Sequence, residues 1–134
     1  MTNTTKNNFS WKWFFFSGKG RITRKQFWFY YIPYLLLTFC IVILDNRYGY
    51  YSDIYKMQVI TTVFGIVTLY PCFAVTIKRF HDRGKSGLWS IIAFFPFLGW
   101  PWIFIDCGLL RGTKGPNDYG PDQEQEKRVI EAFD

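Results

Sequence analysis

Residues 78–87 read Lys-Arg-Phe-His-Asp-Arg-Gly-Lys-Ser-Gly, and this stretch decides how the chain is organised. It holds four cations, one carboxylate, two glycines and the only histidine of the 134-residue chain. An uncharged apolar run ends immediately before it, and a second apolar run begins immediately after it. A soluble globule alternates apolar and polar residues instead of separating them into blocks. The pattern therefore favours a charged connector held at a membrane surface between two spans.

Three apolar segments surround the charged connectors. Residues 27–44 and 57–77 are runs of 18 and 21 residues without a charge, and residues 88–110 are 23 residues with one charge, Asp106. At about 1.5 Å per residue, helices of this length match a hydrocarbon core of roughly 30 Å. The third segment contains Pro96, Gly99 and Pro101, which should bend or break a helix. Two outcomes remain open: a kinked third span, or a re-entrant hairpin that returns the chain to its starting side.

These segments predict an all-α integral membrane fold with three apolar helical segments, the third broken by proline and glycine. Residues 1–26 form a cationic aromatic N-terminal segment, residues 27–110 the membrane domain, and residues 111–134 a Gly/Pro turn motif with a short polar, acidic tail. The bulky aromatic residues of 9–16 stand beside lysines, as in segments that lie in the membrane interface. An ordinary aromatic anchor for the first span explains them equally well.

The positive charge is placed where membrane topology would put it. The formal net charge of the chain is +6; residues 1–26 carry +6, residues 45–56 carry zero, and residues 78–87 carry +3. Ten lysines and arginines on the first and third of these connectors, against two on the second, put both on the cytoplasmic side. We therefore expect a multi-pass protein with a cytoplasmic N-terminus. Its cationic connectors should contact anionic phospholipid headgroups of the lipid bilayer.

The central connector offers no convincing catalytic group. His81 and Asp82 are neighbours, and neighbours on a helix point about 100° apart, so they should not face each other. Asp82 lies four residues after Lys78 and three after Arg79, a spacing that favours ordinary ion pairs. Ser86 is a suitable N-cap for the helix that follows. We expect no enzyme, and a membrane enzyme built on His81 and Asp82 ranks third among the functional hypotheses.

Other sites are weighed and set aside. Asp106 is an intramembrane acid, a functional candidate by default, but Arg111 follows five residues later and favours a position at the interface. Cys40, Cys72 and Cys107 lack disulfide or zinc spacing, so we expect no metal and no cofactor. Nucleic acid is excluded as a partner, because the aromatic residues lie in or beside the spans and not on an exposed basic face.

Three ordered blocks carry a resemblance to a known family. The first block, residues 20–28, reads Gly-Arg-Ile-Thr-Arg-Lys-Gln-Phe-Trp. The second block, residues 78–89, contains Lys-Arg-Phe-His-Asp and then Ser-Gly-Leu-Trp, and the third block, residues 112–121, reads Gly-Thr-Lys-Gly-Pro-Asn-Asp-Tyr-Gly-Pro. With the spans between them, these blocks are similar to the bacterial inner-membrane family called domain of unknown function 805. The resemblance covers residues 16–121 and implies a bacterial inner membrane, but no biochemical activity.

The departures from that pattern are mild. Lys78 stands where paired arginines are usual, Leu88 replaces a common tryptophan, and residues 17–18 lengthen the approach to Gly20. The candidate functional motif consists of the polar residues of the three blocks together with Asp106: Arg21, Arg24, Arg79, His81, Asp82, Arg83, Ser86, Gly87, Asp106, Asn117, Tyr119 and Gly120.

Two functional hypotheses follow. The first is a non-enzymatic scaffold or regulatory component whose cationic connectors lie at the lipid surface. The second is a small transporter or channel subunit, suggested by Pro71, the broken third segment and Asp106. Three spans enclose little, so the protein is expected to pair with further copies of itself or with another membrane protein.

Overall fold

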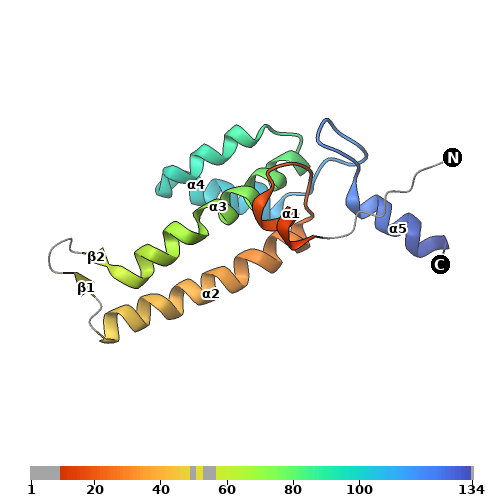
Figure 1. Cartoon of the computed structure of the whole chain (residues 1–134). Coiled ribbons are helices and arrows are strands. Elements are labelled where there is room, and N and C mark those ends of the chain that lie inside the picture. The colour runs from red at the N-terminus through yellow and green to blue at the C-terminus, as the bar shows by residue number, and fades with distance from the viewer. Residues whose placement is uncertain (1–9, 49–50, 53–56, 134) are drawn as a thin grey trace.

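Two long antiparallel helices form the body of the protein in a computed structural model that describes residues 10–48, 51–52 and 57–133 (Figure 1). Helix α2 runs from Arg24 to Tyr48, and helix α3 from Val59 to Asp82. Both are long and apolar enough to cross a membrane. They contain the predicted spans 27–44 and 57–77 apart from two residues, because in lipid every backbone amide must find its partner within the segment. We call the apolar part of this pair the shaft.

Apolar side chains on the shaft point outward. Leu35, Leu36 and Phe39 of α2 are exposed, as are Ile66 and Val67 of α3. Water does not tolerate an apolar surface of this extent on a monomer, whereas lipid does. Between the helices the contacts are polar or aromatic; the Tyr31 hydroxyl, for example, lies 2.7 Å from Thr76 Oγ1. The hydroxyls of Thr62, Thr68 and Thr76 donate to backbone carbonyls one turn earlier in α3 or just before it, so they expose no free donor to the surroundings of the helix.

One carboxylate joins the two helices at the far end of the shaft. Asp45 near the end of α2 is buried, and its Oδ2 accepts from the backbone nitrogen and the hydroxyl of Thr61, at 2.7 and 2.6 Å. Thr61 lies in the first turn of α3, so Asp45 caps that helix from its neighbour. Between α2 and α3, strands β1 (Tyr51–Ser52) and β2 (Met57–Gln58) pair antiparallel.

The third apolar segment is a hairpin and not one continuous helix. It consists of the 3₁₀ helix η1 (Gly87–Phe94), helix α4 (Pro96–Ile103) and the π-helix η2 (Phe104–Leu109). Trp89 and Trp102 stack with ring centroids 6.1 Å apart, and a Cβ added to Gly99 would collide with the carbonyl oxygen of Ile92. Pro96 begins α4 where a missing N–H does no harm.

The hairpin starts and finishes at the same end of α3. Lys85, just before η1, reaches Asp106 in η2 at 2.8 Å, and the carbonyl of Leu110 accepts from Arg79 in the last turn of α3. The predicted break at Pro96, Gly99 and Pro101 is present, and the two halves of the segment pack on each other. The chain returns to the end of α3 from which it started, as the hairpin outcome requires.

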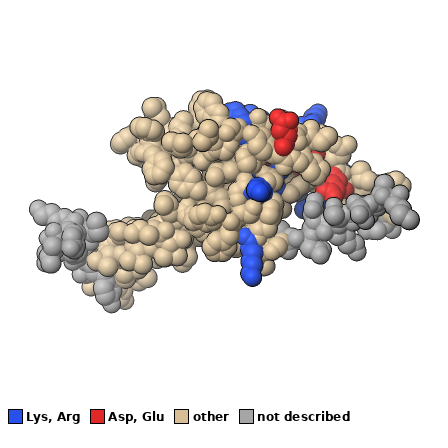
Figure 2. Space-filling view, turned by 45° about the horizontal axis from the view of Figure 1, so that its top comes forward, with Lys and Arg blue, Asp and Glu red and all other residues tan. Residues whose placement is uncertain are grey.

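The remaining elements gather at this end, which we call the head: residues 10–26, 78–87 and 105–133. Helix α1 (Trp11–Phe16) packs against α3. Helix α5 (Gln123–Phe133) gives the predicted polar tail a helical form without a buried residue. The apolar core lies where the head meets the shaft and the hairpin, and consists of Phe14, Ile22, Phe27, Val75, Phe80, Ile103 and Cys107. Figure 2 shows charged side chains over the head, while the shaft surface is uncharged.

The cap between the long helices generates the first prediction. Replacing Asp45 by alanine leaves the Thr61 N–H without its partner and should cost about 1–2 kcal/mol, the usual loss for a helix cap. Thermal unfolding of the detergent-solubilised protein should show a lower midpoint for Asp45→Ala. Arg47→Ala is the control, because Arg47 is exposed at the same end. Equal midpoints for the two variants would show that the cap contributes nothing.

Candidate functional site: a buried charge cluster that joins three sequence blocks

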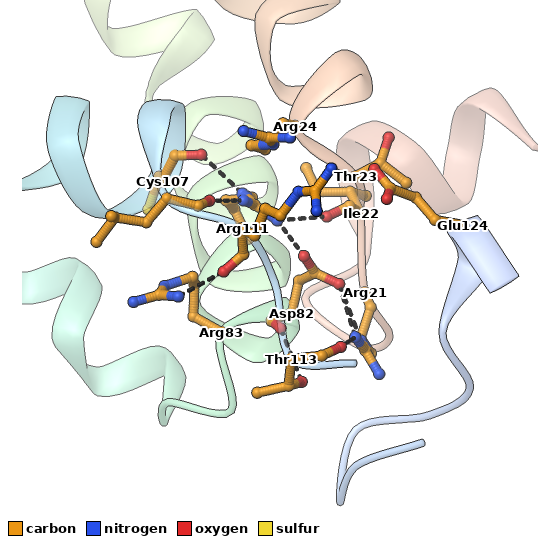
Figure 3. Close-up of polar contacts among 12 residues, drawn as sticks. Arg21, Ile22, Thr23, Arg24, Asp82, Arg83, Cys107, Arg111, Thr113 and Glu124 are labelled. Carbon is orange, nitrogen blue, oxygen red and sulfur yellow. Dashed lines mark hydrogen bonds and ion pairs between the residues drawn. The ribbon is translucent and has the colours of Figure 1, made fainter. Parts of the chain in front are cut away.

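Asp82 is the centre of the head. Its Oδ1 accepts from Arg21 Nε at 3.0 Å, and its Oδ2 accepts from Arg79 Nη1 (Figure 3). All three side chains are buried, and Arg79 is 0% exposed. Two guanidinium groups thus share one carboxylate away from water. This buried arrangement is stable only if the remaining N–H groups of the arginines are also hydrogen-bonded, because removing the charges from water costs free energy.

The other N–H groups of Arg79 donate to backbone carbonyls. Nε donates to Cys107 O at 2.7 Å, Nη2 to Leu110 O at 2.6 Å, and Nη1 also to Ile22 O at 3.3 Å. The first two carbonyls lie at the end of the hairpin, where the helix has no further N–H to offer. Arg79 therefore closes the hairpin on α3 and holds the first block beside it.

Arg21 does the same for the third block. Its Nη1 donates to Gly115 O at 2.8 Å and to Gly120 O at 3.1 Å, and its Nη2 donates to Thr113 O at 2.8 Å. Gly115 and Gly120 have φ angles of +77° and +134°, which side-chain-bearing residues rarely adopt. The loop that wraps around the guanidinium therefore needs glycine at both positions.

The backbone of the third block also lies directly on Asp82. The Thr113 amide and hydroxyl both donate to the carbonyl oxygen of Asp82, at 2.8 and 3.0 Å. A Cβ at Gly112 would collide with the Asp82 carboxylate. A glycine is thus the only residue that lets the chain pass the ion pair at this distance.

His81 and Asp82 face different partners, as expected for helix neighbours. The His81 ring stacks on Tyr119, with centroids 3.9 Å apart and the planes 4° from parallel, and its Nδ1 lies 3.2 Å from Gly20 O. Asn117 Nδ2 donates to His81 O at 2.9 Å and to Thr113 Oγ1 at 2.8 Å. All three blocks therefore meet around His81 too, but no carboxylate is paired with its ring.

A second ion cluster closes the mouth of the hairpin. Asp106 accepts from Lys85 at 2.8 Å and lies 3.5 Å from Arg83, whose guanidinium also donates to Arg111 O. Asp106 is 4% exposed and lies at the head. Its partners are Lys85 and Arg83, two cations of the central connector.

One predicted ion pair is found and one is not. Arg79 pairs with Asp82 as the spacing of three residues suggested. Lys78 does not; its buried Nζ donates to the carbonyls of Trp13 and Phe14 at the C-terminal end of α1. A cation bonded to the last carbonyls of a helix is favourable, and here it holds the aromatic segment against α3.

The other predicted residues take supporting positions. Ser86 accepts from Leu88 N at 3.3 Å, so it is the N-cap of η1. A Cβ at Gly87 would press on Ile77 and on the His81 ring. Arg24 donates to Leu109 O at 3.0 Å, between the first block and the hairpin.

Three participants escaped the sequence analysis: Lys78 as a binder of α1, Thr113 as a partner of Asp82, and Gln123, whose amide donates to Arg21 O at 2.7 Å. Lys78 and Thr113 lie within the second and third blocks, whereas Gln123 lies outside all three. The contacts join residues 31 to 102 positions apart, and no local pattern encodes such pairing.

Beside the cluster lies a polar cavity of about 160 Å³. Asp82 and Arg79 reach its wall, and Thr23, Arg24, Arg111 and α5 complete it (Figure 3). Within the described residues no group of three or more histidine, cysteine or acidic side chains is placed to hold a metal ion.

Comparisons with known proteins identify sequence relatives of the chain. The family model described as "Protein of unknown function (DUF805)" matches residues 15–121, which include all three blocks. The chain is 33% identical to "Inner membrane protein YhaH" of Escherichia coli over 81% of its own length and 88% of that protein. It is 29% identical to "Inner membrane protein YhaI" over 80% and 84%, and 34% identical to "Uncharacterized protein YiiR" over 84% and 89%, both from Escherichia coli. No solved structure matches the chain.

The shared carboxylate generates the second prediction. Asp82→Asn leaves two buried guanidinium groups without a counter-charge and should cost about 3–5 kcal/mol of unfolding free energy. Thermal or denaturant unfolding in detergent measures the loss, and Asp118→Asn, at an exposed position of the third block, is the control. A loss no larger than that of the control would mean that the cluster does not hold the head together.

Gly112 generates the third prediction. Gly112→Ala forces the Asp82 carboxylate away from its arginines and should destabilise the protein by about 1–3 kcal/mol, as overpacking does. Gly65→Ala in α3 is the matched control, because a Cβ there meets nothing within 4 Å. That variant should unfold at the same temperature as the unmodified chain or above it. A Gly112→Ala protein as stable as Gly65→Ala would contradict the close packing.

Proposed function

Since this chain belongs to the DUF805 family of proteins of unknown function, and has relatives named as inner membrane proteins, we propose that it is a non-enzymatic scaffold or regulatory component of the bacterial inner membrane. In this proposal the head faces the cytoplasm and holds anionic lipid headgroups, and the shaft crosses the bilayer. The excess of lysine and arginine at the head supports that orientation.

The observation that carries the proposal is that the cations of the head fall into two groups, buried and exposed. The buried cations Arg21, Lys78 and Arg79 are bonded within the protein. Lys12, Lys19 and Lys25, in contrast, are exposed and take part in none of the ion pairs of the described residues. All three belong to the head: Lys12 lies in α1, Lys19 in the loop that follows, and Lys25 in the first turn of α2.

This division changes which residues the lipid test must replace. The cationic connectors that we expect to contact headgroups contain Arg21, Arg24, Arg79 and Arg83. Arg21 and Arg79 are buried, so their substitution would disturb the fold before it reported on lipid. The exposed lysines are the side chains free to bind lipid phosphates, each worth about 1 kcal/mol near an anionic surface.

The alternative, a small transporter or channel subunit, ranks second. The re-entrant hairpin supports it, since irregular backbone at membrane depth occurs where it is buried in protein or lines a cavity. Against it, Asp106 is held by Lys85 at the head and does not lie along the shaft. Association with further copies of the chain, or with another membrane protein, would cover the exposed hairpin, whose Phe97 is 93% exposed.

The lipid proposal generates the fourth prediction. The triple substitution of Lys12, Lys19 and Lys25 by glutamine should lower the preference for phosphatidylglycerol over phosphatidylcholine several-fold in reconstituted membranes. Spin-labelled lipids measure that preference as the motionally restricted fraction beside the protein. Arg47→Gln, an exposed cation at the other end of the shaft, is the control and should leave the preference unchanged. A triple variant that keeps the full preference would remove the proposal.

A further inference from the structure

The polar cavity beside the charge cluster has a one-sided charge. Its lining contains five cations and three carboxylates, a formal excess of two positive charges (5 − 3). Two of the carboxylates are already occupied: Asp82 is bonded to Arg21 and Arg79, and Asp122 accepts from the backbone amides of Gly115, Glu124 and Gln125. Glu124 is the remaining acid.

The environment of Asp122 shows that it is no competitor for a cation. Burial alone would raise the pKa of its carboxyl, but the N–H groups of Gly115, Gln125 and Glu124 outweigh this effect and lower that pKa below its ordinary value. The carboxylate is therefore ionised at neutral pH and caps the first turn of α5.

Four cations of the lining stay available. Arg24 makes one hydrogen bond, from Nη1 to Leu109 O, and Arg128 makes one, from Nε to Glu124 O. The Arg111 and Lys114 side chains are exposed and take part in no ion pair among the described residues. A guanidinium has five donors in a fixed fork, so Arg24, Arg111 and Arg128 all keep N–H groups for a ligand.

The four come from three separate parts of the chain: Arg24 from the start of α2, Arg111 and Lys114 from the loop after the hairpin, and Arg128 from α5. In Figure 3, Arg24 and Arg111 lie near each other, with Thr23 and Glu124 on the side of α5. Guanidinium forks and a hydroxyl around one space match the tetrahedral oxygens of a phosphate group. A cavity needs only about 15 Å³ for one water molecule, so this one has room for such a group and water.

We propose that this cavity is a discrete binding site for one phosphate-bearing anion, held by Arg24, Arg111, Lys114 and Arg128. The phosphate belongs either to a lipid headgroup that enters beside Arg24 or to a soluble phosphate ester that enters from the water side beside α5. The proposal goes beyond the surface role of the lysines, because it predicts one saturable site per chain.

The test is isothermal titration of the full chain in a phosphate-free, uncharged detergent and chloride buffer. One arm uses inorganic phosphate and the other phosphatidylglycerol in mixed micelles, with phosphatidylcholine micelles as the blank. Saturable one-to-one binding of inorganic phosphate identifies a soluble ester as the source, and such binding of phosphatidylglycerol alone identifies a headgroup. No saturable binding in either arm overturns the proposal.

The variants use neighbours on α5. Arg128 lines the cavity and Lys127 does not, although both are exposed. Arg128→Gln and Arg111→Gln should each weaken binding about tenfold to a hundredfold, the usual effect of a lost charge-assisted hydrogen bond. Lys127→Gln should bind as the unmodified chain does, and thermal unfolding checks that all three variants fold. Equal weakening by Lys127→Gln and Arg128→Gln would overturn the proposal in favour of general charge attraction.

The lysine triple variant separates this site from the surface role. It should lose lipid preference and keep one-to-one binding, because none of its three residues lines the cavity. If the surface proposal fails, the cavity is still decided by the titration; if the cavity fails, the lipid preference is unaffected.

Discussion

The structure depends on one carboxylate shared by two buried guanidinium groups. Asp82 is the shared counter-charge of Arg21 and Arg79, and the remaining donors of both arginines reach carbonyls from the first block, the hairpin end and the third block. Removing charges from water costs several kcal/mol per ion unless every donor is bonded. This constraint holds the three blocks of the head together. If one block detached, a buried charge in another block would lose its hydrogen-bond partners.

The surfaces of the shaft and the head suit different solvents: the shaft suits lipid and the head suits water. Along the shaft, leucine, isoleucine and phenylalanine face outward, and polar atoms are returned to the backbone or to the partner helix. In the head the order is reversed, with charges inside and a mixed surface outside. The buried arginines Arg21 and Arg79 hold segments of the head together, whereas the exposed lysines contribute charge to its surface. Burial therefore separates the cations of the head into two physical roles.

The sequence predicted what depends on local chemistry. Uninterrupted apolar runs must form helices in lipid, so α2 and α3 followed directly, as did the Ser86 cap and the Arg79–Asp82 pair. Proline and glycine predicted a break near Pro96, but they did not predict the direction in which the chain continues after it. That direction is fixed by contacts such as Lys85–Asp106 and Arg79–Leu110, which join residues 21 and 31 positions apart. The role of Lys78 was missed for the same reason, because its partners lie in α1, 65 and 64 residues away.

The turn within the third segment also sets the parity of the chain. The two long antiparallel helices and the hairpin that turns back leave α1 and α5 at one end of the molecule (Figure 1). In the proposed orientation, this corresponds to an even number of membrane passages. An odd number would have parted the glycine-rich third block from Arg21, its main ligand, by the full thickness of a bilayer. The buried ion cluster therefore requires an even number of crossings. A chain that gained or lost one crossing could not form the contacts between Arg21 and the third block.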